Sequence, residues 1–118
     1  MENILSSIKT LLGVESTITA FDAELLFHIN TAISELIQGG VGPDNGLTVT
    51  ATTNWEEFSD NINVVSPSRE YVYCKTRLVW DPPSNSFVCT EISKRAEETY
   101  WRAYITSDEL RKQASSNE

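Results

Sequence analysis

Apolar residues recur every three or four positions in two successive stretches of the chain, which Asp81, Pro82 and Pro83 separate. This spacing places apolar side chains on one face of a helix, so the pattern predicts two amphipathic helices. Two consecutive prolines lack backbone donors and clash with a preceding helical turn, so the first helix should end at Trp80. A short connection between two such helices is typical of an antiparallel helical hairpin.

The starts of both hairpin helices carry candidate capping residues. Ser66 precedes Pro67, and this pair favours a helix start because the hydroxyl accepts a backbone hydrogen bond while proline needs no donor there. We therefore expect the first helix to span residues 66–80. Ser84 and Ser86 are both candidate caps for the second helix, which the pattern extends to about residue 104.

Two further amphipathic helices are predicted before the hairpin. The first begins at Ile4, and Gly13 supplies a residue that readily adopts the left-handed conformation at a helix end. The second starts from Thr19, which approximates a capping box with Asp22, and it ends near Gln38. At about 1.5 Å per residue this second helix is roughly 25 Å long, and we expect it to be the central strut of the fold.

A glycine-rich segment, residues 39–53, connects these helices to the rest of the chain. Its Gly, Pro, Asp and Asn residues form turns readily. Some glycine-rich loops bind phosphate, but here no Lys-Ser/Thr pair follows and no parallel strand is predicted before the loop, which disfavours such a site. Residues 47–52 alternate apolar and threonine side chains, which predicts a short strand. That strand would pair with a neighbouring subunit or form half of a local hairpin.

A short helix is predicted after the loop, because Thr53 is followed three residues later by Glu56. This helix would end near Asn61 and close over the core. The overall prediction is a mainly α protein, a small helical bundle built around the antiparallel hairpin. The predicted core residues are Leu25, Ile29, Ile33, Leu36, Trp55, Phe58, Leu78 and Ile92.

The chain has 118 residues, which suits one domain with a modest core. We assign residues 1–105 to a single helical domain and residues 106–118 to a polar, loose C-terminal tail, in which one more helical turn would be marginal. The side chains of Trp101 and Tyr104 lie just before this tail. They either pack on the first helix or form an interface, where aromatic anchors are favoured.

Acidic residues number 17 against nine basic ones, which gives a formal net charge of −8. General binding to a phosphate backbone is therefore disfavoured, because that affinity comes from cations. An acidic wall would instead let a polyanion slide through a channel. The chain contains no apolar run long enough to span a bilayer, and Met1-Glu2-Asn3 lacks the order of a secretory signal, so we expect a cytosolic protein with no membrane partner.

Candidate catalytic residues are few. His28 is the single histidine and lies at the edge of an apolar helix face, so a boundary position is favoured over a role as proton carrier or ligand. Cys74 and Cys89 fall on the two hairpin helices, and in a reducing compartment two buried thiols are favoured over a disulfide. Their spacing matches no zinc motif. We expect no enzyme, no metal and no cofactor.

Several segments together resemble the head-tail connector, or adaptor, proteins of tailed bacteriophages, which attach to the portal vertex after DNA packaging. The resemblance covers nearly the whole chain up to about residue 104. Its segments are Phe21–Leu26 with Ile29 and Asn30, Gln38–Pro43, Thr53–Phe58, Tyr71–Leu78 running into Asp81-Pro82-Pro83 and Ser84–Phe87, and finally Glu97, Glu98, Trp101 and Arg102.

The resemblance implies a virion protein at the head-tail junction, made in the host bacterial cytoplasm. Its copies would form a ring, usually dodecameric, that extends the DNA channel without binding DNA specifically. The implied partners are other copies, the portal protein, and the next head-completion or tail protein. The loop implied to face a neighbouring subunit or ring includes Gly42, Pro43, Asp44, Asn45, Leu47 and Val49, and the implied portal contacts are Tyr104, Ile105, Ser107, Asp108, Leu110 and Arg111.

An alternative function is open on the residues alone. A small acidic cytosolic protein of this kind could bind and regulate one host protein through its acidic surface. An enzyme would need an activity that depends on His28 or on a cysteine, and no catalytic constellation supports that class.

Overall fold

The computed structural model describes residues 2–116, and within that range the chain forms five helices and no strand. The predicted mainly α fold and small helical bundle are confirmed. Met1, Asn117 and Glu118, which fall within the predicted domain and tail, lie outside the described residues. The helices are α1 (Ile4–Leu12), α2 (Asp22–Gln38), α3 (Trp55–Phe58), α4 (Ile62–Trp80) and α5 (Ser86–Ser116).

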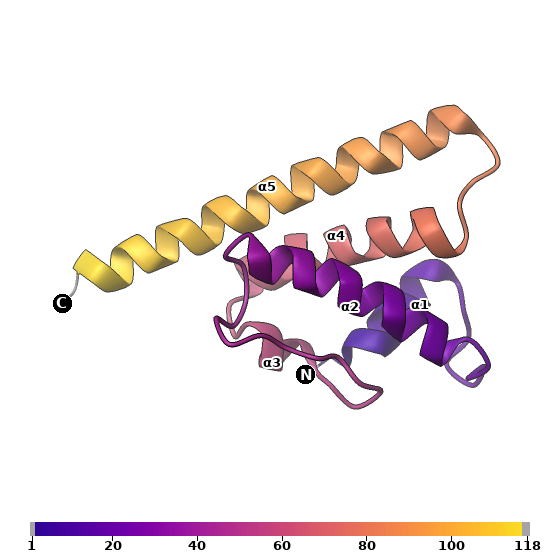
Figure 1. Ribbon diagram of the computed structural model, residues 1–118, viewed down its shortest axis with the longest axis horizontal. Coiled ribbons are helices and arrows are strands. Elements are labelled where there is room, and N and C mark those ends of the chain that lie inside the picture. Colours follow the sequence, from indigo (N-terminus) through magenta and orange to yellow (C-terminus); the bar gives the residue numbers. More distant parts are fainter. Residues whose placement is uncertain (1, 117–118) are drawn as a thin grey trace.

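Helix α4 is the element that the other long helices pack against. It contacts α5 on one side and α1 and α2 on the other (Figure 1). One buried stripe of α4 contains Tyr71 and Cys74, and a second contains Val72 and Thr76. The prediction that α2 is the central strut is therefore wrong, because α4 is buried along two faces whereas α2 keeps one face open to solvent.

The hairpin forms where the prolines interrupt the helical pattern. α4 ends at Trp80, and the N–H of Asp81 donates to the carbonyl oxygen of Arg77 at 3.0 Å. After the two prolines the chain reverses and α5 runs antiparallel to α4 (Figure 1). Ser84 and Ser86 are the predicted caps of α5, but the cap is Asn85. Its Oδ1 accepts a hydrogen bond from the backbone N–H of Phe87 at 2.8 Å. A short carboxamide provides this bond as well as a hydroxyl does.

Helix α4 begins four residues earlier than predicted, at Ile62 rather than Ser66. Asn61 caps it by accepting a hydrogen bond from the N–H of Asn63 at 2.8 Å. Pro67 thus lies inside the helix, where its missing N–H leaves the carbonyl oxygen of Asn63 without a helical partner. Asn63 is exposed, so water can take this bond and the helix tolerates the proline.

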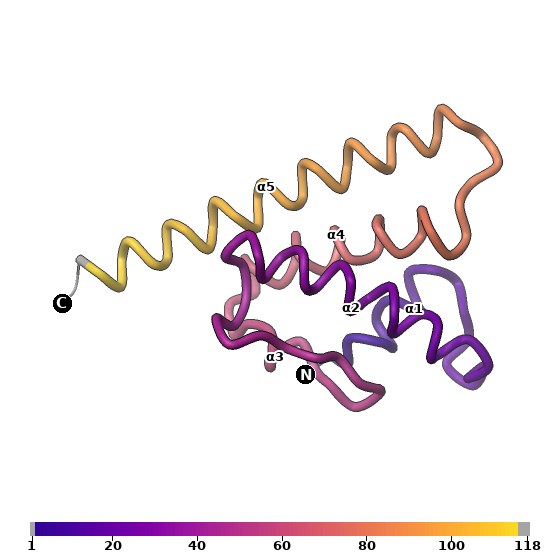
Figure 2. Tube along the Cα trace, viewed as in Figure 1, coloured from indigo at the N-terminus to yellow at the C-terminus, as the bar shows by residue number. Residues whose placement is uncertain are grey.

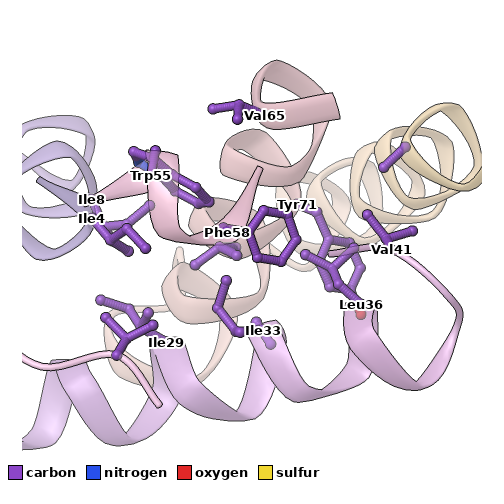
Figure 3. Packing of buried hydrophobic residues seen from close by; sticks show 14 of the residues in the cluster. Ile4, Ile8, Ile29, Ile33, Leu36, Val41, Trp55, Phe58, Val65 and Tyr71 are labelled. Atoms are coloured by element: carbon purple, nitrogen blue, oxygen red, sulfur yellow. The ribbon is translucent and has the colours of Figure 1, made fainter. Parts of the chain in front are cut away.

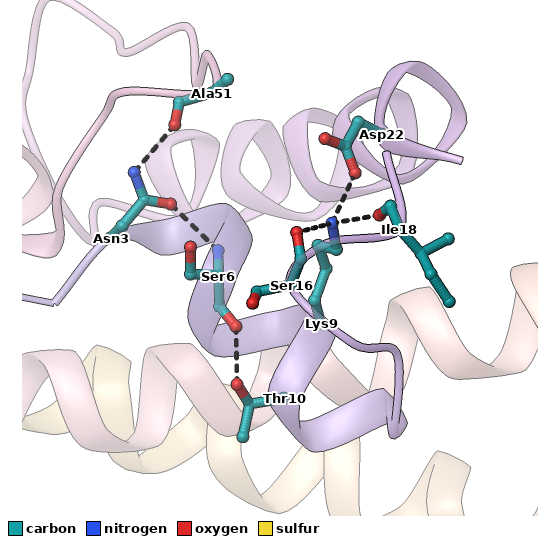
Figure 4. A network of polar contacts seen from close by, with 8 residues as sticks. All are labelled: Asn3, Ser6, Lys9, Thr10, Ser16, Ile18, Asp22 and Ala51. Atoms are coloured by element: carbon teal, nitrogen blue, oxygen red, sulfur yellow. Dashed lines mark hydrogen bonds and ion pairs between the residues drawn. The ribbon is translucent and has the colours of Figure 1, made fainter. Parts of the chain in front are cut away.

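Lys9 determines how α1 and α2 are joined. Its side chain is buried, and its Nζ donates to the carbonyl oxygen of Ile18 at 2.5 Å and to Oδ1 of Asp22 at 2.9 Å (Figure 4). The predicted capping box between Thr19 and Asp22 is absent, because Asp22 pairs with Lys9 instead and Phe21 takes the capping position without a side-chain bond. The loop is therefore held down by one buried cation.

The short helix α3 is shifted by one residue from its predicted start. Asn54 rather than Thr53 is the cap, and Glu57 rather than Glu56 completes the capping box. The helix ends at Phe58 rather than near Asn61, because Asn61 already serves as the cap of α4.

The core lies between α1, α2, α3 and α4 (Figure 3). Trp55 is fully buried, stacks edge-on against Phe58, and donates from Nε1 to the hydroxyl of Ser7 at 2.9 Å. Leu78 and Ile92 are only half-buried, because they line the seam between α4 and α5, which is open to solvent on both sides. The other predicted core residues, Leu25, Ile29, Ile33, Leu36, Trp55 and Phe58, are buried.

The prediction of a loose tail is wrong for residues 106–116, which are helical. Helix α5 continues without a break to Ser116 and extends past the other helices (Figure 1). A separate turn would carry its own nucleation cost, but here the turn only prolongs an existing helix. Ser107 is buried against the body, and Lys112 Nζ lies 3.1 Å from the Asp108 carboxylate one turn earlier, which supports the extension.

We predict that replacing Pro82 and Pro83 with alanine lowers the free energy of unfolding by about 1–2 kcal/mol, because the unfolded chain gains freedom at both positions. The measurement is a urea melt. Pro67→Ala is the matched control and should be neutral or stabilising, because it restores a helical N–H in α4. Equal stability of the wild type and the Pro82→Ala, Pro83→Ala variant would contradict a role of the prolines in the reversal.

Candidate functional site

The loop between α2 and α3 is fastened to the body at several points. It runs back along α2 (Figure 2). The side chain of Asn30 pairs with the backbone of the loop. Asn30 Oδ1 accepts from the N–H of Val49 at 2.7 Å, and Asn30 Nδ2 donates to the carbonyl oxygen of Val49 at 3.0 Å. The predicted strand over residues 47–52 does not form, because this side-chain amide takes the place of a neighbouring strand.

Only part of the loop is free for contact with another subunit. Val49 is 3% exposed and lies in this subunit's own core, so the prediction that it faces a neighbour is wrong for this conformation. The tip of the loop is open. Of the other predicted contact residues, Asp44 and Asn45 are exposed, and Gly42, Pro43 and Leu47 are half-buried.

The glycines at the start of the loop serve packing and chain direction. Gly42 has φ of 99°, and a Cβ there would lie 2.6 Å from the ring of Phe58. Gly40 has φ of 91°, and its carbonyl oxygen accepts a 2.6 Å hydrogen bond from Arg111 Nη1. These positions therefore need glycine for its left-handed backbone and its small size. This explains the glycine run without a phosphate site.

The predicted portal-contact residues lie along one continuous stretch of α5 rather than on a tail. Arg111 is held by Gly40, and Asp108 lies 3.7 Å from Arg111. Ser107 is buried and is not open to a partner. Ile105 and Leu110 are 39% and 37% exposed. Tyr104 is half-buried and stacks on Trp101.

The hairpin presents two sides, which we call side A and side B. A buried line through Ala96, Thr99 and Ala103 separates them on α5. Side A has a groove of about 480 Å³ whose lining includes Lys75, Leu78, Ser93, Glu97 and Trp101. Side B has one groove of about 430 Å³ and a second of about 530 Å³, with linings that include Glu70, Val88, Glu98, Arg102 and Ile105.

Side A is flanked by the end of α2. Tyr71 donates a 3.0 Å hydrogen bond to Oε1 of Glu35 on α2, and burial together with this carboxylate raises the pKa of Tyr71 well above its usual range. Tyr100 of α5 packs against Tyr71 and reaches Gly39. Trp101 is 58% exposed, and a role of this side chain in an interface stays a prediction.

A family model described as phage connector protein matches residues 4–110. The chain belongs to the phage connector protein family. The match runs from the start of α1 into the last turns of α5, so it includes every helix of the described residues. No curated protein and no solved structure matches the chain significantly. The protein therefore has a structural, connecting role in a phage and is associated with other phage head and tail proteins.

The charge of this connector is segregated along its chain. Residues 10–68 contain eight acidic residues and no lysine or arginine, so they carry the whole net charge of −8. This segment includes α2, the loop and α3, which lie together on the side of the molecule opposite α5 (Figure 1). The α4–α5 hairpin has nearly balanced charge. One layer thus has a large excess of acidic residues, and the other has mixed charge.

Residues that carry chemistry in other proteins are dispersed here. His28 is half-buried against Phe27 and lies 4.0 Å from Glu24, as expected of a boundary histidine. Cys74 is buried, as predicted, whereas Cys89 is only half-buried, and both cysteines are free thiols. Within residues 2–116 no three His, Cys, Asp or Glu side chains gather in a way that could hold a metal ion. The described helices include none that is long and apolar enough to cross a membrane.

The sequence did not reveal the two contacts that fix the loop. Asn30 lies on the polar edge of α2, and Arg111 lies in a segment expected to be loose. Neither residue belongs to a motif, and each contacts backbone far away in the chain, Val49 and Gly40 respectively. Only the folded chain brings these partners together.

We predict that Asn30→Ala lowers the free energy of unfolding by about 1–3 kcal/mol, because it leaves two backbone groups of Val49 without partners. Hydrogen exchange at the Val49 amide should accelerate. The control is Thr31→Ala, whose exposed hydroxyl bonds only to Phe27 in the same helix. Equal exchange rates at Val49 in the two variants would show that the amide clamp does not hold the loop.

We predict that the stability contributed by Cys74 declines in alkali. Burial, with a smaller effect of the Glu70 carboxylate, raises the pKa of this thiol from 9.0 to about 11. As the pH rises, the Cys74 thiol therefore ionises in the unfolded chain before it ionises in the folded protein. The free energy of unfolding of the protein falls as the pH rises from 9 towards 11. Urea melts across this range should show the advantage of wild type over Cys74→Ala shrinking. A difference that stays constant with pH would refute this assignment.

Proposed function

We propose that this connector protein assembles into a ring at the portal vertex, joins the DNA-filled head to the tail and extends the DNA channel. The observation that carries the proposal is the family match over residues 4–110, which covers the whole helical body. Rings in such proteins are usually dodecameric. A closed ring requires that each subunit present two different surfaces, one to each neighbour.

The hairpin suits a ring subunit because it is rigid and open on two sides. α4 is buried by α1 and α2 below and by α5 above, so its position is well determined. α5 has 31 residues, about 46 Å at 1.5 Å per residue, and gives the subunit one long straight edge. Sides A and B remain uncovered within the subunit.

The acidic layer suits a wall beside DNA. Glu15, Glu24, Asp44, Glu57 and Asp60 are exposed on the segment that has no basic residue. A uniformly acidic wall repels phosphates weakly, which lets DNA pass without specific binding. We therefore assign this layer to the channel side of the ring.

The end of α5 and the tip of the loop lie beside each other, because Asp44, Leu110 and Arg111 line one groove, and together they suit contacts with other proteins. We assign the exposed end of α5, including Ile105, Asp108 and Leu110, to the portal protein. The open tip of the loop, Asp44 and Asn45, is assigned to a neighbouring subunit or ring, including the next head-completion or tail protein. The protein would then reside at the head-tail junction of the virion after synthesis in the host bacterial cytoplasm.

Electron microscopy of this protein mixed with the portal protein of the same phage genome tests the proposal. We expect a ring stacked coaxially on the portal. The absence of any association, both with isolated portals and with DNA-filled heads, would contradict the proposal. A stable one-to-one complex with a host protein would then favour the regulatory alternative.

We predict that deleting residues 106–118 abolishes portal attachment, because it removes the end of α5. The deletion also removes buried Ser107 and the Arg111 bond to Gly40, so some loss of stability is expected. The matched control, deletion of residues 112–118, keeps both contacts and should retain the melting temperature of the wild type. Full portal attachment by the folded 106–118 deletion would exclude the end of α5 as the portal contact.

A further inference from the structure

The two sides of the hairpin lie on opposite flanks of the α4–α5 pair. α4 and α5 lie beside each other in the view down the shortest axis of the molecule (Figure 1), and grooves line the seam between them on both sides. Glu97 lines side A and Glu98 lines side B. Adjacent positions on a helix differ by about 100° in direction, which places these two carboxylates on different flanks of α5.

Five charged side chains on these sides make neither a hydrogen bond nor an ion pair among residues 2–116. On side A they are Lys75 and Glu97. On side B they are Glu98, Arg102 and Glu109, of which Glu98 is close enough to Arg95 for an electrostatic attraction. Side A thus offers one cation and one anion, and side B offers one cation and two anions.

Most other charges on side B are already paired. Arg95 bonds to Glu70 of α4, and Lys94 lies 3.6 Å from Glu91. Besides Glu109 at the far end of the second groove, these internal pairs leave Glu98 and Arg102 as charges of side B that lack an ion-pair partner among the described residues. They lie one turn apart on α5, about 6 Å along the helix axis.

Apolar side chains accompany the free charges on both sides. Trp101 is 58% exposed at the edge of the groove on side A. On side B, Val88 and Ile105 are each 39% exposed. Exposed aromatic residues next to complementary charges are typical of interface centres.

We propose that side A of one copy of the chain docks on side B of the next copy, with Lys75 facing Glu98 and Glu97 facing Arg102. With the hairpin axis along the ring axis, rotation keeps every residue at its own height, and Glu97 and Arg102, about 7.5 Å apart along α5, stay within reach of these long side chains. Trp101 packs beside Ile105 of the next copy. This inference rests on the proposed ring and identifies a joint between the hairpins of adjacent subunits.

The charge pattern favours a head-to-tail contact over other uses of these sides. A two-fold dimer through side A could pair Lys75 with Glu97 of the other copy, but it would leave side B uncovered and could not extend into a ring, whereas a head-to-tail contact uses both sides. A partner of a single charge would satisfy only the charges of the opposite sign on each side. Another copy of the chain supplies both opposite charges at once, and each subunit in the ring uses both sides.

Charge exchange across the joint tests the proposal. Lys75→Glu and Glu98→Lys are made singly and together, and rings on the portal protein are counted by electron microscopy. Each single change sets like charges against each other and should lower the ring population by roughly tenfold or more. The double variant restores the pair in reversed order and should recover rings to within about threefold of wild type.

The control is Glu15→Lys, which makes the same charge change as Glu98→Lys at an exposed position in the loop between α1 and α2. It should leave ring formation unchanged. Circular dichroism checks that each variant is folded. If Lys75→Glu fails to fold, the exchange of Glu97→Lys with Arg102→Glu provides the same test.

The outcomes separate this joint from the ring itself. Rescue of ring formation in the double variant supports the joint. Normal rings in both folded single variants, or loss without rescue in the double variant, would overturn the joint while leaving the connector function intact. The absence of rings with the wild-type protein would overturn both.

Discussion

Burial of α4 along two faces is the constraint on which the rest of the structure depends. Tyr71 and Cys74 lie in the stripe that meets α5, and Val72 and Thr76 are buried on another face. A helix covered on two sides cannot tilt toward one neighbour without losing contact with the other. The hairpin, the α1–α2 layer and the seam between them are thereby fixed relative to one another.

Side chains that contact distant backbone fasten the parts that have no regular structure. Lys9 holds the loop between α1 and α2, Asn30 holds the loop after α2, and Arg111 joins that loop to the end of α5. Each contact satisfies polar groups that would otherwise lack partners. An assembly protein benefits from this arrangement, because segments that are already ordered lose less entropy when they meet a neighbour.

The distribution of charge and apolar surface divides the molecule by task. The acidic layer of residues 10–68 suits a surface that DNA passes without binding. The hairpin carries mixed charges and exposed apolar side chains such as Trp101, which suit contact with protein. Both properties are compatible with the connector role and support the proposed ring.

The sequence by itself determined the helical class, the reversal at Pro82 and Pro83, and most of the core, including Leu25 and Trp55. Helical periodicity and proline geometry are local properties, so they can be read from neighbouring residues. The resemblance to connector proteins also came from the sequence, through segments spread along nearly the whole chain.

Only the tertiary structure decided the capping residues, the central role of α4, the conformation of the loop after α2 and the length of α5. Asp22 pairs with Lys9 rather than completing a capping box, and Asn30 replaces the expected strand partner of Val49. These outcomes depend on groups far apart in sequence competing for the same hydrogen bonds. Local patterns contain no information about which distant group forms each hydrogen bond, so the partners are known only from the folded chain.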